Sequence, residues 1–316
     1  MTHPLSLQLG ASLYCPATRA DLVPLGNGKI PQLRSLIYCL EDAVSVGDLP
    51  RAMENLRACL PALEPRGPRS PLRFVRVRNP AVAEQVSGWS GIERIHGLVI
   101  PKLSQSNLKD YLEAIDPALP LMLTLETPEV FSATAMERLR DALLERNLTE
   151  RIISLRVGGN DLFASLGLRR TRGETVHESV LGATLAMLVT TFKPYGFNLT
   201  SPVYEAYSDP ATLVRELRQD LNRGLFGKTV IHPAQVDVVE SAYRVSLEAL
   251  IEAEAILAHE AQAVFAWRGR MCEPSTHRAW ATWVLARAEV YGMESISGDG
   301  LQSRRDEYAG EVIHAG

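Results

Sequence analysis

Adjacent carboxylates follow a short apolar stretch near the N-terminus. Glu41 and Asp42 come directly after IYCL (37–40), which has the composition of a buried strand. Two like charges at close range raise each other's pKa and cost stability. The pair therefore predicts one of two things: a solvated loop start, or chemistry at the end of a strand.

Glu126 and Asp161 also follow apolar stretches, LMLTL (121–125) and IISLRV (152–157). Both are hard oxygen ligands, and Mg²⁺ is usually held by one or two such carboxylates plus waters and substrate oxygens. Gly158 and Gly159 precede Asn160 and would let a ligand approach the backbone closely. We expect Gly159 and Asn160 to contact substrate. The alternative for Glu126 is a helix start, where a carboxylate is favourable.

Cations accompany these acids. Arg76 lies at the end of the apolar stretch in LRFVRVRNP, where its charge would be unfavourable without a nearby anion. Its planar guanidinium suits a carboxylate. A structural ion pair with Glu41 or Asp42 is the alternative. Arg19, in CPATR, is either a second site cation or an exposed loop charge. His232 precedes a proline and is interpreted as a rim residue rather than a base.

Eight apolar, β-rich runs recur along the chain, as expected for strands buried on both faces of a parallel sheet. The runs are 11–15, 36–40, 72–77, 97–101, 121–125, 152–157, 196–203 and 228–232. Amphipathic stretches between them, at 49–60, 128–145, 178–192 and 209–224, predict helices. The alternation favours a closed (β/α)₈ barrel, and the absence of G-x-G-x-x-G after the first strand disfavours an open dinucleotide-binding sheet. In such a barrel, the polar residues at the strand ends would meet at one rim.

The pattern changes after His232. A long helical run is predicted over 234–266, then a break, then a second helix over 277–292. We therefore expect a barrel domain over 1–240 and a C-terminal helical arm over 241–316, which would serve as an oligomer contact or a lid.

Composition limits the class of protein. The 316 residues carry a net charge of −4, which disfavours binding to nucleic acid or to an anionic membrane. There is no apolar run long enough for a membrane span, and the first residues do not read as a secretion signal. Scattered cysteines without a C-x-x-C predict reduced thiols and a cytoplasmic location.

Seven fragments, in order, carry a family resemblance: YCPATR, CLEDAV, FVRVRNP, GLVIPKL, LTLETPEVF, LRVGGNDLFASLG and GLFGKTVIHPAQV. With these the sequence resembles the citrate lyase β-subunit-like family of the HpcH/HpaI aldolase superfamily, which includes malyl-CoA and citramalyl-CoA lyases. The resemblance covers about residues 11–240 and indicates a divergent branch. It implies a (β/α)₈ barrel, usually a trimer, that uses Mg²⁺ to break or make a carbon–carbon bond.

The resemblance also implies roles for single residues. Glu126 and Asp161 match the metal-binding acids, and Arg76 matches the arginine that holds substrate oxygens. Arg19 matches a second cation of the site. The acidic pair of the family, near the metal waters and the substrate, corresponds to Glu41 and Asp42, either of which is a candidate base.

The C-terminal segment departs from the family pattern. Related lyases carry there an aspartate that reaches a neighbouring subunit's site, whereas this chain reads RMCEPSTH, so Glu273 would have to substitute. The departure puts the acyl-CoA specificity and any thioester hydrolysis in question.

The expected function is a Mg²⁺-dependent lyase that cleaves a short 3-hydroxyacyl-CoA, of the citramalyl-CoA or malyl-CoA type, to an acyl-CoA and an α-keto acid. An aldolase acting on free pyruvate or oxaloacetate is the first alternative. A non-catalytic partner subunit of a larger lyase is the second, and the retention of Glu126, Asp161 and Arg76 disfavours it.

Overall fold

The computed structural model describes residues 3–68, 70–294 and 312–314. Contacts divide the chain into two compact units, Met1–Val239 and Glu240–Gly316. Each unit has its own strands and helices and is described by itself.

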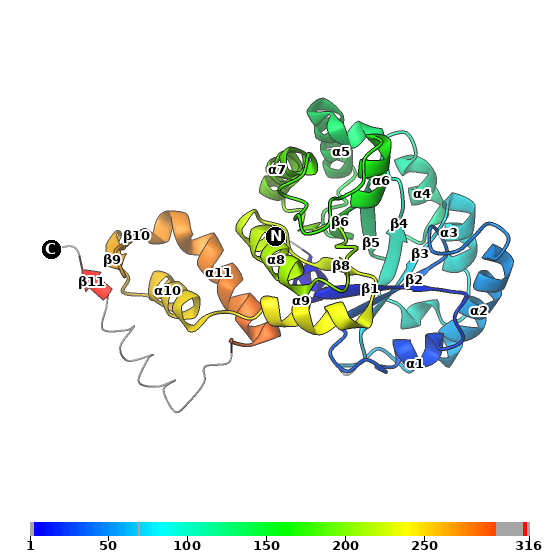
Figure 1. Cartoon of the computed structure of the whole chain (residues 1–316), viewed down its shortest axis with the longest axis horizontal. Helices are drawn as coiled ribbons and strands as arrows, with labels where there is room; N and C mark the ends of the chain where they lie inside the picture. The colour runs from blue at the N-terminus through cyan, green and yellow to red at the C-terminus, as the bar shows by residue number, and fades with distance from the viewer. Residues whose placement is uncertain (1–2, 69, 295–311, 315–316) are drawn as a thin grey trace. The chain divides into compact units, whose positions relative to one another are not determined.

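Eight parallel strands form the sheet of the first unit (Figure 1). Their order is β7-β6-β5-β4-β3-β2-β1-β8, and a parallel bridge between Ser201, just after β7, and Lys228 of β8 closes the circle. This is the predicted (β/α)₈ barrel. The strands are β1 (Ala11–Pro16), β2 (Ser35–Cys39), β3 (Leu72–Arg76), β4 (Gly97–Ile100), β5 (Leu121–Leu125), β6 (Ile152–Val157), β7 (Leu199–Thr200) and β8 (Lys228–Val230).

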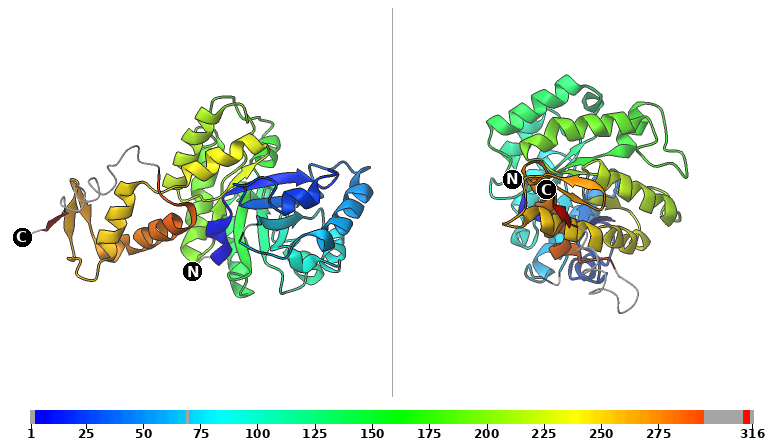
Figure 2. Two further views of the ribbon diagram at one scale, coloured as in Figure 1. Left: turned by 90° about the horizontal axis from the view of Figure 1, so that it is seen from below. Right: turned by 90° about the vertical axis from the view of Figure 1, so that its left-hand side faces the viewer.

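Helices surround these strands, and Figure 2 shows the ring from two further sides. Local sequence sets where they begin: the Asp209 side chain accepts a hydrogen bond from the Thr212 backbone and is followed by Pro210, so α8 starts there. The helices are α1 (Leu22–Gly26), α2 (Leu49–Ala62), α3 (Pro80–Ser87), α4 (Leu108–Ala114), α5 (Ala133–Glu145), α6 (Gly159–Ser165), α7 (Leu181–Phe192), α8 (Pro210–Asn222) and α9 (Val236–Ala242). Short 3₁₀ turns are η1 (Pro4–Gln8), η2 (Ile92–Arg94), η3 (Pro128–Phe131), η4 (Lys193–Tyr195) and η5 (Pro233–Gln235).

The barrel interior is apolar toward one end and polar toward the other. The apolar layer consists of Leu9, Ile37, Phe74, Val99, Met122 and Ile153, with Leu5 of η1 packed against it. Further along the same strands, toward their carboxyl ends, Arg76, Thr124 and Arg156 line a cavity. Because the apolar layer fills the interior, polar chemistry is confined to the carboxyl-end rim.

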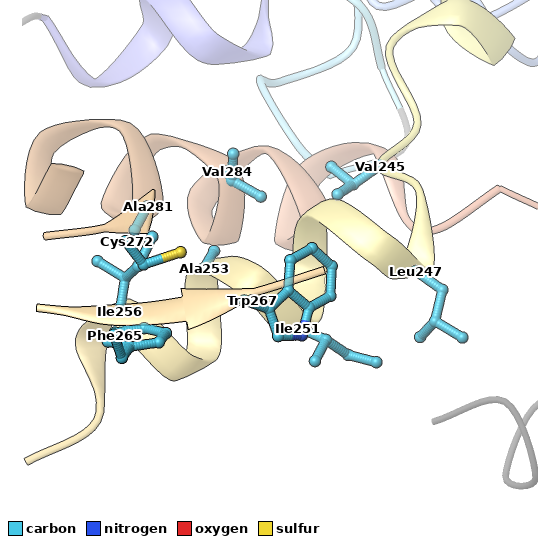
Figure 3. Close-up of a cluster of buried hydrophobic side chains, with 10 residues drawn as sticks. All are labelled: Val245, Leu247, Ile251, Ala253, Ile256, Phe265, Trp267, Cys272, Ala281 and Val284. Carbon is cyan, nitrogen blue, oxygen red and sulfur yellow. The ribbon is translucent and has the colours of Figure 1, made fainter. Parts of the chain in front are cut away.

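The second unit contains helices α10 (Leu247–Leu257) and α11 (Pro274–Tyr291) and a small antiparallel sheet of β9 (Phe265–Trp267), β10 (Arg270–Cys272) and β11 (Val312–His314). Figure 3 shows its apolar core, in which Trp267 is fully buried. The two helices supply most of the other core side chains, Ile251, Ala253, Ile256, Ala281 and Val284 among them.

The prediction of one helix over 234–266 is wrong. Ser246 caps a new helix by accepting a hydrogen bond from the Ala249 backbone, which separates α9 from α10. The segment then ends in a hairpin whose turn residues, Arg268 and Gly269, both have positive φ angles. That turn favours a β-hairpin, so the predicted helical arm also contains a sheet.

All four cysteines are buried and free, in line with the expectation of unpaired thiols. They lie on β1, β2, α2 and β10. Within the described residues, no helix combines the length and the apolar character needed to cross a membrane.

Candidate active site

A cavity of about 250 Å³ opens at the carboxyl ends of the barrel strands. Side chains from β1, β2, β3, β5, β6 and β8 and from the loops after them form its wall. The lining residues are Tyr14, Cys39, Asp42, Ala43, Arg76, Thr124, Glu126, Arg156, Val157, Gly158, Gly159, Asn160, Asp161, Val203, Thr229 and Ile231.

Arg76 holds three carboxylates together at this cavity. As the last residue of β3 it lies in register with Cys39 of β2, which places it beside the acids that follow β2. Its Nη2 lies 2.6 Å from Glu41 Oε2, 2.9 Å from Asp42 Oδ2 and 3.2 Å from Glu126 Oε1. The structural ion pair considered from the sequence is thus present, and it lies at the cavity.

Glu41 and Asp42 have different electrostatic environments. Burial raises the pKa of Glu41, although Arg76 opposes this. Burial also acts on Asp42, but a hydrogen bond with Glu41 and the charge of Arg76 outweigh it and lower the pKa of Asp42. Two carboxyl groups with pKa values pushed apart are suited to different proton-transfer roles.

Lys102 was not among the predicted site residues, yet it contacts all four acids. Its backbone N–H donates to Glu126 Oε1 at 2.8 Å. Its Nζ lies 2.7 Å from Glu41 Oε1, 3.3 Å from Asp42 Oδ1 and 3.4 Å from Asp161 Oδ1. The backbone φ of 47° at this residue lies in the left-handed region, which is uncommon for a residue other than glycine. The available signal was a lysine directly after a buried strand and a proline.

Glu126 is almost fully buried at the end of β5, and burial raises its pKa to about 7. Both of its hydrogen bonds fall on Oε1, and its Oε2 has no hydrogen bond to any described residue. Gly158 makes room for this side chain, because a Cβ there would lie 2.1 Å from Glu126 Oε2.

The donor set fits Mg²⁺. Glu126 and Asp161 both line the cavity and lie close enough for the charge of Asp161 to raise the pKa of Glu126. Within the described ranges, no group of three or more His, Cys, Asp or Glu side chains has the geometry of a metal site. Two carboxylates, one with a free oxygen, are what a Mg²⁺ ion that keeps waters and substrate oxygens requires.

Residues 3–293 match the family described as C-C bond lyase of the TIM-barrel fold. The chain belongs to this family. It is therefore an enzyme of the carbon–carbon lyase class, related to citrate lyase β-subunits.

Two relatives of this C–C bond lyase have named activities on CoA thioesters. The chain is 27% identical over 293 residues to a (3S)-malyl-CoA thioesterase of Cereibacter sphaeroides, covering 88% of this chain and 94% of that protein. It is 32% identical over 136 residues to the mitochondrial citramalyl-CoA lyase of Homo sapiens, covering 41% of this chain and 39% of that protein.

The fold is shared with a solved relative. The crystal structure of CitE from Mycobacterium tuberculosis, in complex with magnesium, acetoacetate and coenzyme A, matches with a TM-score of 0.65 at 22% identity. The match covers 90% of this chain and 100% of that one. At this identity the likeness shows the fold alone.

Gly159 and Asn160, predicted to contact substrate, line the cavity of this C–C bond lyase. Gly159 also packs closely, since a Cβ there would lie 2.8 Å from Pro202 Cβ. The glycines after β6 therefore have a packing reason besides the predicted ligand approach. Their part in substrate binding stays a prediction.

Arg19 lies elsewhere. Its side chain is half exposed in the β1–α1 loop, and it forms two hydrogen bonds to Asp21, at 2.8 Å and 2.9 Å. It does not line the cavity. In this structure Arg19 does not reach the cavity, and its predicted contact with substrate stays a prediction.

His232 caps η5: its side chain accepts a hydrogen bond from the Ala234 backbone, and its ring stacks on that of Tyr207 with the ring centres 4.5 Å apart. This position suits the interpretation as a rim histidine. Glu273 lies in the second unit, before α11, and accepts a hydrogen bond from the Thr276 hydroxyl. Its predicted contribution to a neighbouring subunit's site stays a prediction.

Proposed function

We propose that this chain is a Mg²⁺-dependent lyase that cleaves a short 3-hydroxyacyl-CoA to an acyl-CoA and an α-keto acid. The observation that carries the proposal is the convergence of Glu126, Asp161 and Arg76 on one cavity of a C–C bond lyase barrel. The magnesium and coenzyme A in the CitE complex of M. tuberculosis support it.

Glu126 and Asp161 would hold the ion. When bound, magnesium supplies Lewis acidity to the carboxylate and carbonyl oxygens of the keto-acid half. Arg76 lies beside the same acids and would stabilise negative charge on oxygen as the carbon–carbon bond breaks.

A carboxylate of the Glu41–Asp42 pair would take the proton from the substrate hydroxyl. The C–O bond then becomes a carbonyl, and the electrons of the carbon–carbon bond pass to the thioester as an enolate that is protonated to the acyl-CoA. Burial raises the pKa of Glu41, which suits a group that accepts a proton and returns it, and Asp42 is the member of the pair that lines the cavity.

The size of the cavity indicates which part of the substrate it holds. Ligand pockets for drug-sized molecules occupy about 300–1,000 Å³, whereas this one has about 250 Å³. A short hydroxyacyl group fits that space, and the coenzyme would extend beyond it.

The proposal is tested with a panel of short hydroxyacyl-CoA thioesters and free hydroxy acids, each with Mg²⁺ and with EDTA. Keto acid and free thiol are measured in parallel. We expect the enzyme to release keto acid without free thiol. We expect this release only from the thioesters and only when Mg²⁺ is present. Free thiol without keto acid would indicate hydrolysis, the activity named for the C. sphaeroides relative. Keto acid from the free hydroxy acids would favour the aldolase alternative.

The partner-subunit alternative predicts a different result. A chain that releases no keto acid from any thioester and forms a stable complex with another protein would contradict the lyase proposal.

A further inference from the structure

Arg156 is a buried cation in the wall of the cavity, and no role has been assigned to it above. It lies on β6, in register with Thr124 of β5, and both side chains line the cavity. Its side chain and backbone together are 2% exposed. Its guanidinium donates to the Thr229 hydroxyl and to the Met122 sulfur and lies 5.5 Å from the centre of the Tyr14 ring.

No carboxylate of the described residues lies within ion-pair distance of Arg156. Arg73, buried equally deeply on β3, shows the contrast. Its guanidinium donates to the backbone carbonyls of Gly26, Glu64 and Arg94 on the outer side of the barrel. Three carbonyls accept from Arg73, although its Nη2 has no hydrogen-bond partner, and Arg73 does not line the cavity. Arg156 does line it, and its acceptors are one hydroxyl and one weak sulfur.

Burying a charge is costly unless it is paired and hydrogen-bonded. The cavity wall beside Arg156 also contains polar atoms without partners, Thr124 Oγ1 and Arg76 Nε. Arg76 itself is already bonded through Nη2 to three carboxylates. Arg156 is therefore the cation of this wall whose charge the described residues leave uncompensated.

We propose that Arg156 binds a second carboxylate on the keto-acid half of the substrate, so that the enzyme acts on hydroxyacyl thioesters that release a dicarboxylic keto acid. This inference rests on the proposed lyase function and narrows its substrate class. A planar guanidinium pairs with a carboxylate through two parallel hydrogen bonds, and such pairs are strong where water is excluded. The Thr124 hydroxyl adds a donor on the same wall.

The charges around the site are consistent with this assignment. Four carboxylates, Glu41, Asp42, Glu126 and Asp161, face the cations of Arg76 and Lys102. A divalent ion beside these acids would shift the balance toward positive charge. Arg156 forms no ion pair with a described carboxylate, so a substrate anion there would meet a cation that no protein acid already pairs with.

The test compares binding of matched acids that differ by one carboxylate: oxaloacetate with pyruvate, and malate with lactate. Isothermal titration in Mg²⁺ is carried out on the full chain, on Arg156→Met and on Arg138→Gln, an exposed arginine of α5. Wild type and Arg138→Gln should bind the diacids more tightly than the monoacids. Arg156→Met should lose about tenfold or more on the diacids and less than twofold on the monoacids.

Thermal unfolding separates this role from a structural one. Replacing an uncompensated buried charge with an apolar side chain of similar length is neutral or stabilising, so ligand-free Arg156→Met should unfold no earlier than wild type. Arg156→Lys, which keeps the charge, should retain part of the preference for diacids.

Equal loss of diacid and monoacid binding in Arg156→Met, or no preference for diacids in wild type, would overturn the inference. A preference for diacids in a chain that releases no keto acid from any thioester would sustain the role of Arg156 and overturn the lyase proposal. If the enzyme cleaves only thioesters that yield monocarboxylic keto acids, and Arg156→Met cleaves them as well as wild type does, the lyase proposal stands and the role of Arg156 is overturned.

Discussion

Arg76 and Lys102 together contact Glu41 and the three acids that line the cavity, Asp42, Glu126 and Asp161. Adjacent carboxylates such as Glu41 and Asp42 are costly in isolation, and these two cations offset their repulsion. Burial would lower the pKa of Lys102, but its hydrogen bond to Glu41 and the surrounding acids raise it, so the lysine stays charged. The acids are thus held in place before a metal ion binds.

Replacing Lys102 with methionine should destabilise the metal-free protein. The change removes the ammonium that links Glu41, Asp42 and Asp161, and because Lys102 is nearly half exposed the expected loss is only about 1–2 kcal/mol. Urea unfolding in EDTA measures it. With saturating Mg²⁺ the difference from wild type should shrink, since the ion supplies positive charge to the same acids.

Lys109→Met provides the matched control, because Lys109 is exposed on α4 and, among the described residues, its one ion pair is with Glu113. Equal losses for Lys102→Met and Lys109→Met would show that Lys102 does not hold the acids together.

Glu126 gives the metal-free protein a specific pH dependence. Its pKa is about 7 in the folded state against 4.5 for the free side chain, so between these values the folded state binds the proton more tightly. Glu126 therefore contributes its full stabilisation of the folded state below about pH 4.5, and this contribution is lost as the pH rises through 7. The loss is about 3 kcal/mol.

Glu126→Gln removes this dependence. In urea unfolding with EDTA from pH 5 to 8, the wild type should lose up to about 3 kcal/mol relative to Glu126→Gln. Parallel stability curves for the two proteins would contradict the buried, proton-binding state of Glu126.

Among the elements, the junction of β6 and α6 sets the geometry of the site most tightly. Gly158 follows the strand as the N-cap residue of α6 and lies against Glu126, while Asp161 lies in the first turn of α6. This one backbone turn therefore positions both proposed metal ligands. Gly158 leaves space for the Glu126 side chain, and Asp161 is part of the turn itself.

Gly158→Ala should lower Mg²⁺ affinity. The added Cβ would lie 2.1 Å from Glu126 Oε2 and 2.5 Å from Glu126 Cβ, so the carboxylate must move. Displacements of about 1 Å in a positioned group cost up to about 100-fold in function, and we expect at least about a tenfold loss by isothermal titration. Gly47→Ala, where a Cβ meets nothing within 4 Å, should bind Mg²⁺ as the wild type does. Unchanged affinity in Gly158→Ala would place the ion away from Glu126.

The sequence predicted the eight barrel strands because each is a nearly continuous apolar run, and it predicted α2, α5, α7 and α8 because each has an apolar stripe. It assigned no range to α1, α3, α4 or α6. It failed between 234 and 266, where a mostly apolar composition concealed the Ser246 cap and the start of β9 at Phe265. Local turn chemistry decided the structure there, and helical periodicity did not.

For the whole molecule, strand order brought the distant acids and Arg76 together as the sequence predicted, since the carboxyl ends of all barrel strands share one rim. Lys102 and Arg156 were not identified as site residues. Strand pattern does not show whether a buried cation has partners. Arg73 and Arg156 look alike in their strands, and they differ in that carbonyls accept from Arg73 whereas Arg156 lines the cavity.

The central claim is that carbon–carbon cleavage depends on an ion held by Glu126 and Asp161. The most direct measurement is keto-acid release from a cleaved hydroxyacyl-CoA as a function of Mg²⁺ concentration, for wild type, Glu126→Gln and Asp161→Asn. We predict saturable activation by Mg²⁺ in the wild type, none in EDTA, and a loss of about 100-fold or more in each variant. Undiminished Mg²⁺-dependent release in either variant, or equal release in EDTA, would contradict the account.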